Sequence, residues 1–301
     1  MKKIYLFLFI TSVTFLNAQI TVTTGGTALA LAQAIAGNGI TVSNAVLNCG
    51  TVSYGLFASG NTGVGNVGLA NGVLLTTGQA TDVAGAATDF LAFNSSSSYI
   101  GSNAGDVDLK AIASNADRNT CKLEFDLVPI CDNLEIKYVF ASEEYPDFVC
   151  SPYNDAFAFF ISGPGITGSK NIAIVPGTTT MGVAINSINN GIVGSSGVAG
   201  GCTSTAYTSL YVDNSSGSQI AYNGFTTPLT ASASIIPCQT YHFKIVIADA
   251  GDALYDSGVF LLQDGVTCVT PVLTATASPN SICAGQSSTL TASGSVSGTF
   301  T

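Results

Sequence analysis

The strongest constraint on this chain is an alternation of polar and apolar residues with a period of two. Lys122–Leu127, Leu134–Tyr138 and Tyr241–Ile245 each place an apolar side chain at every second position. In an extended strand such positions share one face, so each segment predicts a strand with one buried face. Further strand candidates, separated by clusters of Gly, Asn, Ser and Pro, are residues 155–162, 171–175, 182–188, 207–213 and 258–263. Many short strands between turn signals predict an all-β fold, an antiparallel two-layer β-sandwich of the jelly-roll kind.

One segment departs from this pattern. Residues 27–36 predict a single short helix near the N-terminus, with Thr27 as its N-cap and Gly37 as its stop. Long amphipathic segments rich in Ala, Glu, Lys and Arg, which build helical bundles, are missing from the sequence. The chain is 47% hydrophobic and only 9% charged, a composition that fills a core and disfavours disorder.

The first 18 residues predict a secretory signal peptide. Lys2 and Lys3 precede an apolar run over residues 4–16, and Ala18 offers a small residue for cleavage. The run is too short to span a bilayer, and no other stretch is long and apolar enough, so we expect no membrane span in this segment. Export machinery is therefore the first expected partner. Cleavage removes two lysines and changes the formal net charge from −10 to −12.

The charge balance excludes several classes of function. Eight Lys and Arg face 18 Asp and Glu, so the chain lacks the clustered bases that track nucleic-acid phosphates. The one histidine, His242, excludes metal centres that need two or three His ligands. His242 lies at a polar position of its strand, which favours an exposed strand residue over a catalytic base.

Export also changes how the cysteines are interpreted. Outside the reducing cytosol, cysteines favour disulfides over catalytic thiols, and no CxxC pair is present. Eight cysteines allow 105 pairings, and the sequence does not choose among them. If Cys283 pairs beyond residue 301, one of the other seven is left over. The disulfide candidates are Cys49, Cys121, Cys131, Cys150, Cys202, Cys238, Cys268 and Cys283.

Two strands of the predicted sandwich resemble each other. Residues 131–142 align without gaps on residues 238–249, with identical Cys, Lys and Ala at three positions. The flanking residues do not match, which favours two similar sandwich strands over a true duplication. Each segment leads into an acidic loop, and the two loops are expected to be neighbours if the strands run in the same direction.

Several motifs together resemble the choice-of-anchor L domain of secreted Bacteroidetes surface proteins. The best matches are Tyr-Val-Phe-Ala-Ser-Glu-Glu-Tyr at 138–145 and Tyr-Asn-Asp-Ala-Phe-Ala-Phe-Phe-Ile-Ser-Gly at 153–163, with supporting pieces at 40–44, 55–57, 72–78 and 248–257. The resemblance covers residues from about 31 to 262, and we assign residues 19–270 to this domain. It implies a secreted protein on the outer face of a Gram-negative bacterium, commonly exported by type IX secretion. It implies location more firmly than chemistry.

The composition shifts near Pro271 toward Ser, Thr and Ala. Residues 271–301 read as the first two strands of an incomplete Ig-like domain, since such a module needs roughly 100 residues. We therefore expect the sequence to be the front part of a longer surface protein.

Acidic residues concentrate near two predicted strand ends, and they are the candidate metal ligands. Calcium takes six to eight oxygens from carboxylates and carbonyls on loops, so a Ca²⁺ site is one hypothesis. The spacing is not that of an EF-hand, and the alternatives are an ordinary solvated loop or carboxylates that cap turn N–H groups. The candidate ligands are Glu143, Glu144, Asp147, Asp155, Asp249, Asp252 and Asp256.

The sequence favours a binding module over an enzyme. Adjacent Glu143 and Glu144 would point to opposite faces of a strand, so they cannot form a glycosidase pair together. The chain also has no Trp on which a sugar ring could stack. We expect a non-catalytic module for adhesion or for binding an extracellular ligand, glycan or surface. The alternatives are a structural spacer and, third, an accessory domain or carboxylate-dependent hydrolase.

Overall fold

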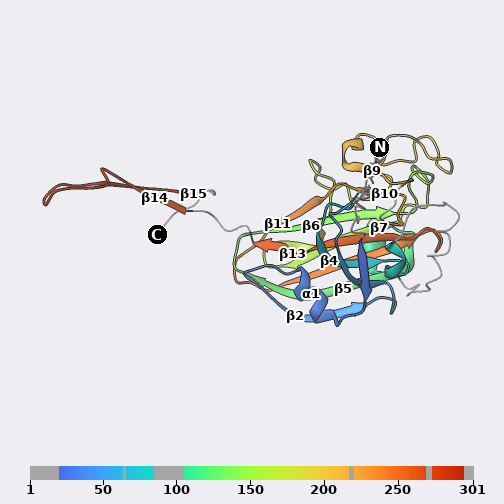
Figure 1. The fold of residues 1–301 in the computed structure, drawn as a ribbon, viewed down its shortest axis with the longest axis horizontal. Coiled ribbons are helices and arrows are strands. Elements are labelled where there is room, and N and C mark those ends of the chain that lie inside the picture. Colours follow the sequence, from blue (N-terminus) through green and yellow to red (C-terminus); the bar gives the residue numbers. More distant parts are fainter. Residues whose placement is uncertain (1–19, 64–65, 85–104, 217–219, 269–272, 295–301) are drawn as a thin grey trace, which may run out of the picture.

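Two antiparallel sheets pack face to face and form the body of the molecule in this computed structural model (Figure 1). The structure describes residues 20–63, 66–84, 105–216, 220–268 and 273–294. The predicted signal peptide, residues 1–18, lies outside these ranges. The arrangement confirms the predicted two-layer β-sandwich.

The larger sheet has eight strands in the order β1-β3-β4-β13-β6-β10-β9, with β11 also paired to β6. Its strands are β1 (Thr21–Thr24), β3 (Tyr54–Ala58), β4 (Asn71–Thr76), β6 (Asn133–Ser142), β9 (Tyr211–Asp213), β10 (Gly224–Thr226), β11 (Leu229–Ser234) and β13 (Ser257–Cys268). A short 3-10 helix, η1 (Ala80–Val83), follows β4, and another, η3 (Thr208–Leu210), precedes β9.

The smaller sheet has five strands in the order β2-β5-β12-β7-β8. They are β2 (Ile40–Asn48), β5 (Ala116–Pro129), β7 (Ala156–Gly163), β8 (Ile166–Asn171) and β12 (Tyr241–Ala250). The described ranges also contain the α-helices α1 (Ala28–Ile35) and α2 (Val107–Ile112). No helix among the described residues is long and apolar enough to cross a membrane.

The main core lies between the two sheets and follows from the alternation in the sequence. Leu123, Phe125 and Leu127 of β5 are fully buried, while the residues between them are partly exposed. They share the core with aromatic side chains such as Tyr138 of β6, whose ring centroid lies 4.7 Å from that of Phe159. Smaller apolar clusters cover parts of the outer faces, so the centre of the sandwich is buried on both sides.

The prediction of a strand over residues 182–188 is wrong, although its apolar residues are buried. The side chain of Ser187 donates to the carbonyl of Gly182 at 2.8 Å and accepts from the N–H of Ala184 at 2.9 Å. These local bonds turn the backbone, and only isolated bridges remain. Of the predicted strand over 171–175, only Asn171 belongs to a strand, β8. The predicted strand over 207–213 is divided between η3 (Thr208–Leu210) and β9 (Tyr211–Asp213).

Helix α1 confirms the predicted cap and stop. The hydroxyl of Thr27 accepts a hydrogen bond from the N–H of Ala30 at 3.2 Å, and the helix ends before Gly37. A Cβ on Gly37 would lie 2.9 Å from the carbonyl oxygens of Asp264 and Val266, so only glycine fits against β13.

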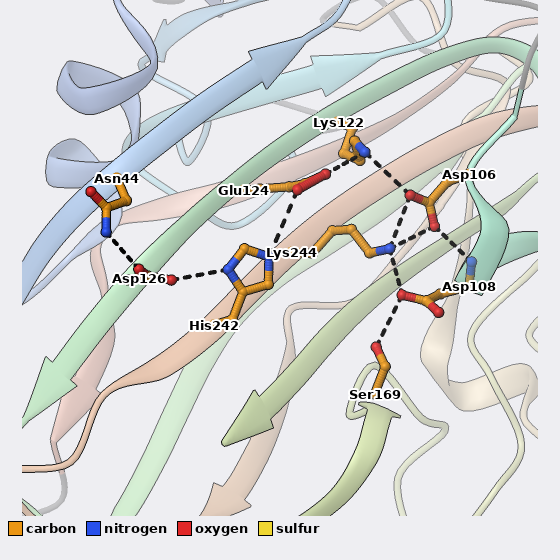
Figure 2. Close-up of polar contacts among 9 residues, drawn as sticks. All are labelled: Asn44, Asp106, Asp108, Lys122, Glu124, Asp126, Ser169, His242 and Lys244. Atoms are coloured by element: carbon orange, nitrogen blue, oxygen red, sulfur yellow. Dashed lines mark hydrogen bonds and ion pairs between the residues drawn. The ribbon is translucent and has the colours of Figure 1, made fainter. Parts of the chain in front are cut away.

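Helix α2, which the sequence did not predict, is fixed to the smaller sheet by a buried ion pair (Figure 2). Asp106 caps the helix and accepts from Lys244 Nζ through both oxygens, at 2.7 and 2.9 Å. Asp108 accepts from the same ammonium at 2.6 Å. Burial alone would raise the pKa of Asp106, but its hydrogen bonds and the charges of Lys244 and Lys122 hold the pKa below its ordinary value.

Six of the eight cysteines form disulfides. The bonds join Cys49 to Cys121, Cys131 to Cys268, and Cys150 to Cys202. Cys238 and Cys283 are exposed and unbonded within the described residues. The structure thus supports the expected disulfides and supplies the pairing that the sequence left open.

The last described residues form a two-stranded hairpin, β14 (Leu273–Ser278) and β15 (Thr289–Gly294). Figure 1 shows it apart from the sandwich. Two strands are present where two were expected, and an Ig-like domain at this place stays a prediction.

Replacing Asp106 with alanine should lower the free energy of unfolding by about 3 kcal/mol. The change removes the N-cap of α2 and one partner of the Lys244 ammonium, whose side chain is only 8% exposed. Urea unfolding of both proteins measures the difference. The matched control is Asp117→Ala, which breaks only surface ion pairs and should cost less than about 1 kcal/mol. Equal losses would contradict the role given to Asp106.

Candidate functional site

Five carboxyl side chains meet inside the sandwich where strands of both sheets end. We call them the buried acidic cluster: Glu143, Glu144, Asp155, Asp249 and Asp256. Each is at most 2% exposed. Two follow β6, one precedes β7, one lies near the end of β12 and one precedes β13. The two acidic loops that follow the similar sequence segments are therefore neighbours.

Backbone groups tie the two loops together at the cluster. The N–H of Asp256 donates to a carboxylate oxygen of Glu143 at 2.8 Å, and the N–H of Glu143 donates to the carbonyl of Asp256 at 2.9 Å. Thr77 joins this pair from the end of β4, since its hydroxyl accepts from the N–H of Ser257 at 2.9 Å.

Asp155 links the two sheets. One carboxylate oxygen accepts from the N–H of Ala250 in β12 at 2.9 Å. The other accepts from the hydroxyl of Ser257 in β13 at 2.7 Å. Because β12 and β13 belong to different sheets, this side chain holds the two layers together at one end of the sandwich.

Two carboxylate oxygens in the cluster have no hydrogen-bond partner within the described residues. They are Oε2 of Glu144 and Oδ1 of Asp249, and both side chains are 1% exposed. The second oxygen of Asp249 accepts from the side-chain amide of Asn119 at 2.9 Å. A buried acceptor without a donor is costly, so these two oxygens need a proton of their own, an ordered water or a cation.

The electrostatics of the cluster lead to the same conclusion. Burial, followed by the negative charges of neighbouring acids, raises the pKa of Glu144 to about 11. Burial raises the pKa of Asp155 to about 8 despite its two accepted hydrogen bonds, and it raises the pKa of Asp249 well above the ordinary value. All the charged side chains that shift these groups are acidic, so among the described residues no basic partner neutralises them.

The structure does not bring all seven predicted ligands together. Asp252 lies at the rim, where its charge acts on Glu144 while its own oxygen accepts from the N–H of Leu254 at 3.0 Å. Asp147 turns away and accepts from the hydroxyl of Ser195 at 2.8 Å. The cluster therefore keeps five of the seven residues.

The cluster suits a hard cation by its chemistry, because it offers only oxygen donors and two of them lack a partner. In the part of the chain that the structure describes, however, no three His, Cys, Asp or Glu side chains form a preformed metal site. Binding Ca²⁺ would thus require side chains to move inward and backbone carbonyls or water to complete the coordination. The Ca²⁺ site stays a prediction.

Sequence reasoning missed the residues that surround the cluster. Ser257 adjoins an acidic motif and could have been included on that ground. Thr77 and Asn119 reach the cluster from β4 and β5, and only the sheet pairing brings them there. Asp106 and Lys244 form a separate buried polar site that a capping signal before residue 107 could have suggested.

In chelator-treated buffer, the free energy of unfolding should fall as the pH rises from 5 to 8. Glu144 and Asp155 have ordinary pKa values of 4.5 and 3.8, and the fold raises these to about 11 and about 8. The folded state holds the extra protons, so this stability is complete below the ordinary values and is lost as the pH rises through the raised ones. Each such proton contributes a slope of about 1.4 kcal/mol per pH unit.

Urea unfolding at several pH values measures this slope, and the variant Glu144→Gln isolates the cluster's share. The amide keeps the shape of the side chain and has no proton to lose in this range. The variant should show a shallower slope, and identical slopes would contradict the assignment.

Comparison with known proteins identifies the family of this chain. A family model for the choice-of-anchor L domain matches residues 19–267. The search of curated proteins and the search of solved structures each find no match. The family match includes both acidic loops and all four strands that end at the buried acidic cluster. The chain therefore belongs to the choice-of-anchor L domain family, a family of surface-associated domains.

Proposed function

We propose that this chain is a non-catalytic binding module of a secreted surface protein, on the outer face of a Gram-negative bacterium, and that Ca²⁺ stabilises it. The observation that carries the calcium part is the buried acidic cluster, in which two oxygens lack a partner and the neighbouring charges are acidic, as far as the described ranges extend. Family membership supports the surface location. The module would attach the protein to an extracellular ligand, glycan or surface.

A divalent cation is the simplest way to keep the cluster ionised at neutral pH. Ionised carboxylates inside a fold are stable only when they are paired or coordinate a metal. Calcium accepts flexible sets of six to eight oxygens, whereas Mg²⁺ requires near-octahedral geometry and gives up its water reluctantly. A group of carboxyls on several loops suits the larger and more tolerant ion.

The cluster is connected to a large surface loop. Tyr145 follows Glu144 directly, and its hydroxyl donates to the carbonyl of Ile188 at 2.6 Å. The disulfide between Cys150 and Cys202 ties the same loop to the segment that follows Ile188. A cation that fixes Glu144 would therefore also fix the loops that face solvent, where sandwich proteins commonly bind ligands.

The burial of the cluster supports a non-catalytic role. The cavity beside it, lined by Glu143, Tyr222 and Asp256 among others, has a volume of about 10 Å³. That volume holds about one water molecule and cannot admit a sugar ring. This favours the binding module over the carboxylate-dependent hydrolase.

Calcium should raise the melting temperature of the chelator-treated chain. At a free concentration 100-fold above the dissociation constant, binding to the folded state alone adds about 2.7 kcal/mol of stability. Scanning calorimetry with and without CaCl₂ measures the shift, and MgCl₂ should give a smaller one. An unchanged melting temperature in chelator and in calcium would exclude the site.

Isosteric variants assign this shift to the cluster. Glu144→Gln and Asp249→Asn remove charge but keep volume, so both should fold and lose the calcium shift. The matched control is Asp132→Asn at an exposed acid, which should keep the full shift. A shift that survives in both cluster variants would place the cation elsewhere.

A surface-binding assay separates the binding module from the structural spacer. The labelled chain should bind cells, glycans or matrix proteins saturably in calcium, and it should bind less when chelator loosens the loops. Circular dichroism at the assay temperature confirms that the chain stays folded. A spacer would show no saturable binding to any of these surfaces under either condition.

A further inference from the structure

A second feature is an open cavity of about 450 Å³ at the edge of the smaller sheet. It lies between the end of α2, the end of β8 and the segment over residues 174–187. We call it the α2–β8 pocket, and its defining residues are Ile112, Asn154, Lys170, Asn171, Met181 and Thr203. Its size lies within the range of natural ligand sites.

The walls of the α2–β8 pocket are held in place by polar contacts. Ser169, the residue before Lys170, donates to Asp108 of α2 at 3.1 Å (Figure 2). Asp108 in turn accepts from the buried Lys244. The two sides of the pocket, α2 and β8, are therefore fixed to each other and to the sheet beneath them.

The opposite wall is fixed by a buried asparagine and a disulfide. The carbonyl oxygen of the Asn154 side chain accepts from the N–H of Asn186 at 2.8 Å. The Asn186 side chain accepts from the N–H of Cys150 at 2.6 Å and donates to the carbonyl of Ser151 at 2.7 Å. Cys150 is bonded to Cys202, which places Thr203 at the pocket.

Two amide groups present donors to the α2–β8 pocket. The side-chain oxygen of Asn171 accepts from the N–H groups of Phe159 at 3.2 Å and Ala173 at 3.0 Å. The oxygen of Asn154 is likewise occupied, as described above. Within the described residues neither side-chain NH₂ group donates a hydrogen bond, so both are available to the oxygens of a ligand.

The charged lining of the α2–β8 pocket is shared with a second cavity beside β11, because Lys170 lines both. Lys170 is the one charged residue among those lining it, it is exposed, and it forms no ion pair with a described residue. No acid lines the pocket, although the chain carries 18 acids and 8 bases. Ile112, Ile174 and Met181 supply apolar surface beside these polar groups.

We propose that the α2–β8 pocket binds an acidic sugar, a hexuronic acid unit of an extracellular glycan. Its carboxylate would pair with Lys170, its hydroxyl oxygens would accept from Asn154 and Asn171, and its C–H face would pack on Ile174 and Met181. A pocket that lacks acids inside an acidic protein accepts an anion without the repulsion that the rest of the surface would impose. The inference rests on the proposed function, because it names the ligand of that binding module.

Isothermal titration calorimetry of the chain in buffer that contains CaCl₂ tests the site. The probes are a glucuronic acid-containing disaccharide, its neutral glucose-containing counterpart and inorganic phosphate. The acidic disaccharide should bind at least tenfold more tightly than the neutral one and more tightly than phosphate. Equal affinity for the two sugars, or a preference for phosphate, would overturn the proposal.

Two variants locate the binding. Asn171→Asp keeps both accepted backbone bonds, replaces the NH₂ donor and adds a negative charge, so it should abolish binding of the acidic sugar while the fold is kept. Lys170→Ala should weaken that binding at least tenfold, whereas Lys137→Ala, at an exposed lysine of β6, should not change it. Unchanged affinity in Asn171→Asp would exclude this pocket.

The outcomes separate the two proposals. A chain that binds cells saturably in calcium but binds no acidic disaccharide would overturn the inference and leave the proposed function standing. A chain that binds neither would overturn both.

Discussion

A buried carboxylate needs a partner, and the end of this sandwich where β6, β7, β12 and β13 meet is organised around five carboxyl groups. Removing such groups from water costs several kcal/mol each unless protons, donors or a cation compensate. Backbone N–H groups and hydroxyls satisfy Glu143 and Asp155. Glu144 and Asp249 each keep one carboxylate oxygen without a donor among the described residues. The geometry of the loops that carry them is therefore linked to the group that neutralises their charge.

On the outer face of the smaller sheet, a buried carboxylate is instead neutralised by basic side chains. There Asp106 is also buried, but Lys244 and Lys122 lie beside it and its pKa is lowered. At the buried acidic cluster the neighbours are acids and the pKa values are raised. The contrast shows that burial alone does not determine the charge state, and that the sign of the neighbouring charges does. One acidic site is neutralised by lysines of the chain, and the other has only acids among its described charged neighbours.

The sequence predicted those parts of the fold that depend on local pattern. The alternation over β5 and over residues 134–138 of β6 survives as alternating burial, and Thr27 caps α1 as its position indicates. In β12 the alternation is lost after His242, because Lys244 is buried with its ion-pair partners. Residues 182–188 have the same apolar spacing but do not form a strand, because the Ser187 hydroxyl bonds the backbone of Gly182 and Ala184. The acidic loops were expected to be neighbours on the condition that the two similar strands run in the same direction. The α2–β8 pocket was not predicted, since its residues come from five distant segments with no shared local signal.

The disulfide between Cys131 and Cys268 gives this end of the domain a mechanical property. Cys268 is the last residue of β13, and Cys131 lies just before β6, its neighbour in the larger sheet. Tension applied to the chain beyond residue 268 therefore passes through a covalent bond into the start of β6 as well as into β13. Such a load shears β6 and β13 together. Without the disulfide, the load would peel β13 away alone and break its hydrogen bonds one at a time. A surface protein that is pulled by flow or by its attachment experiences forces of this kind.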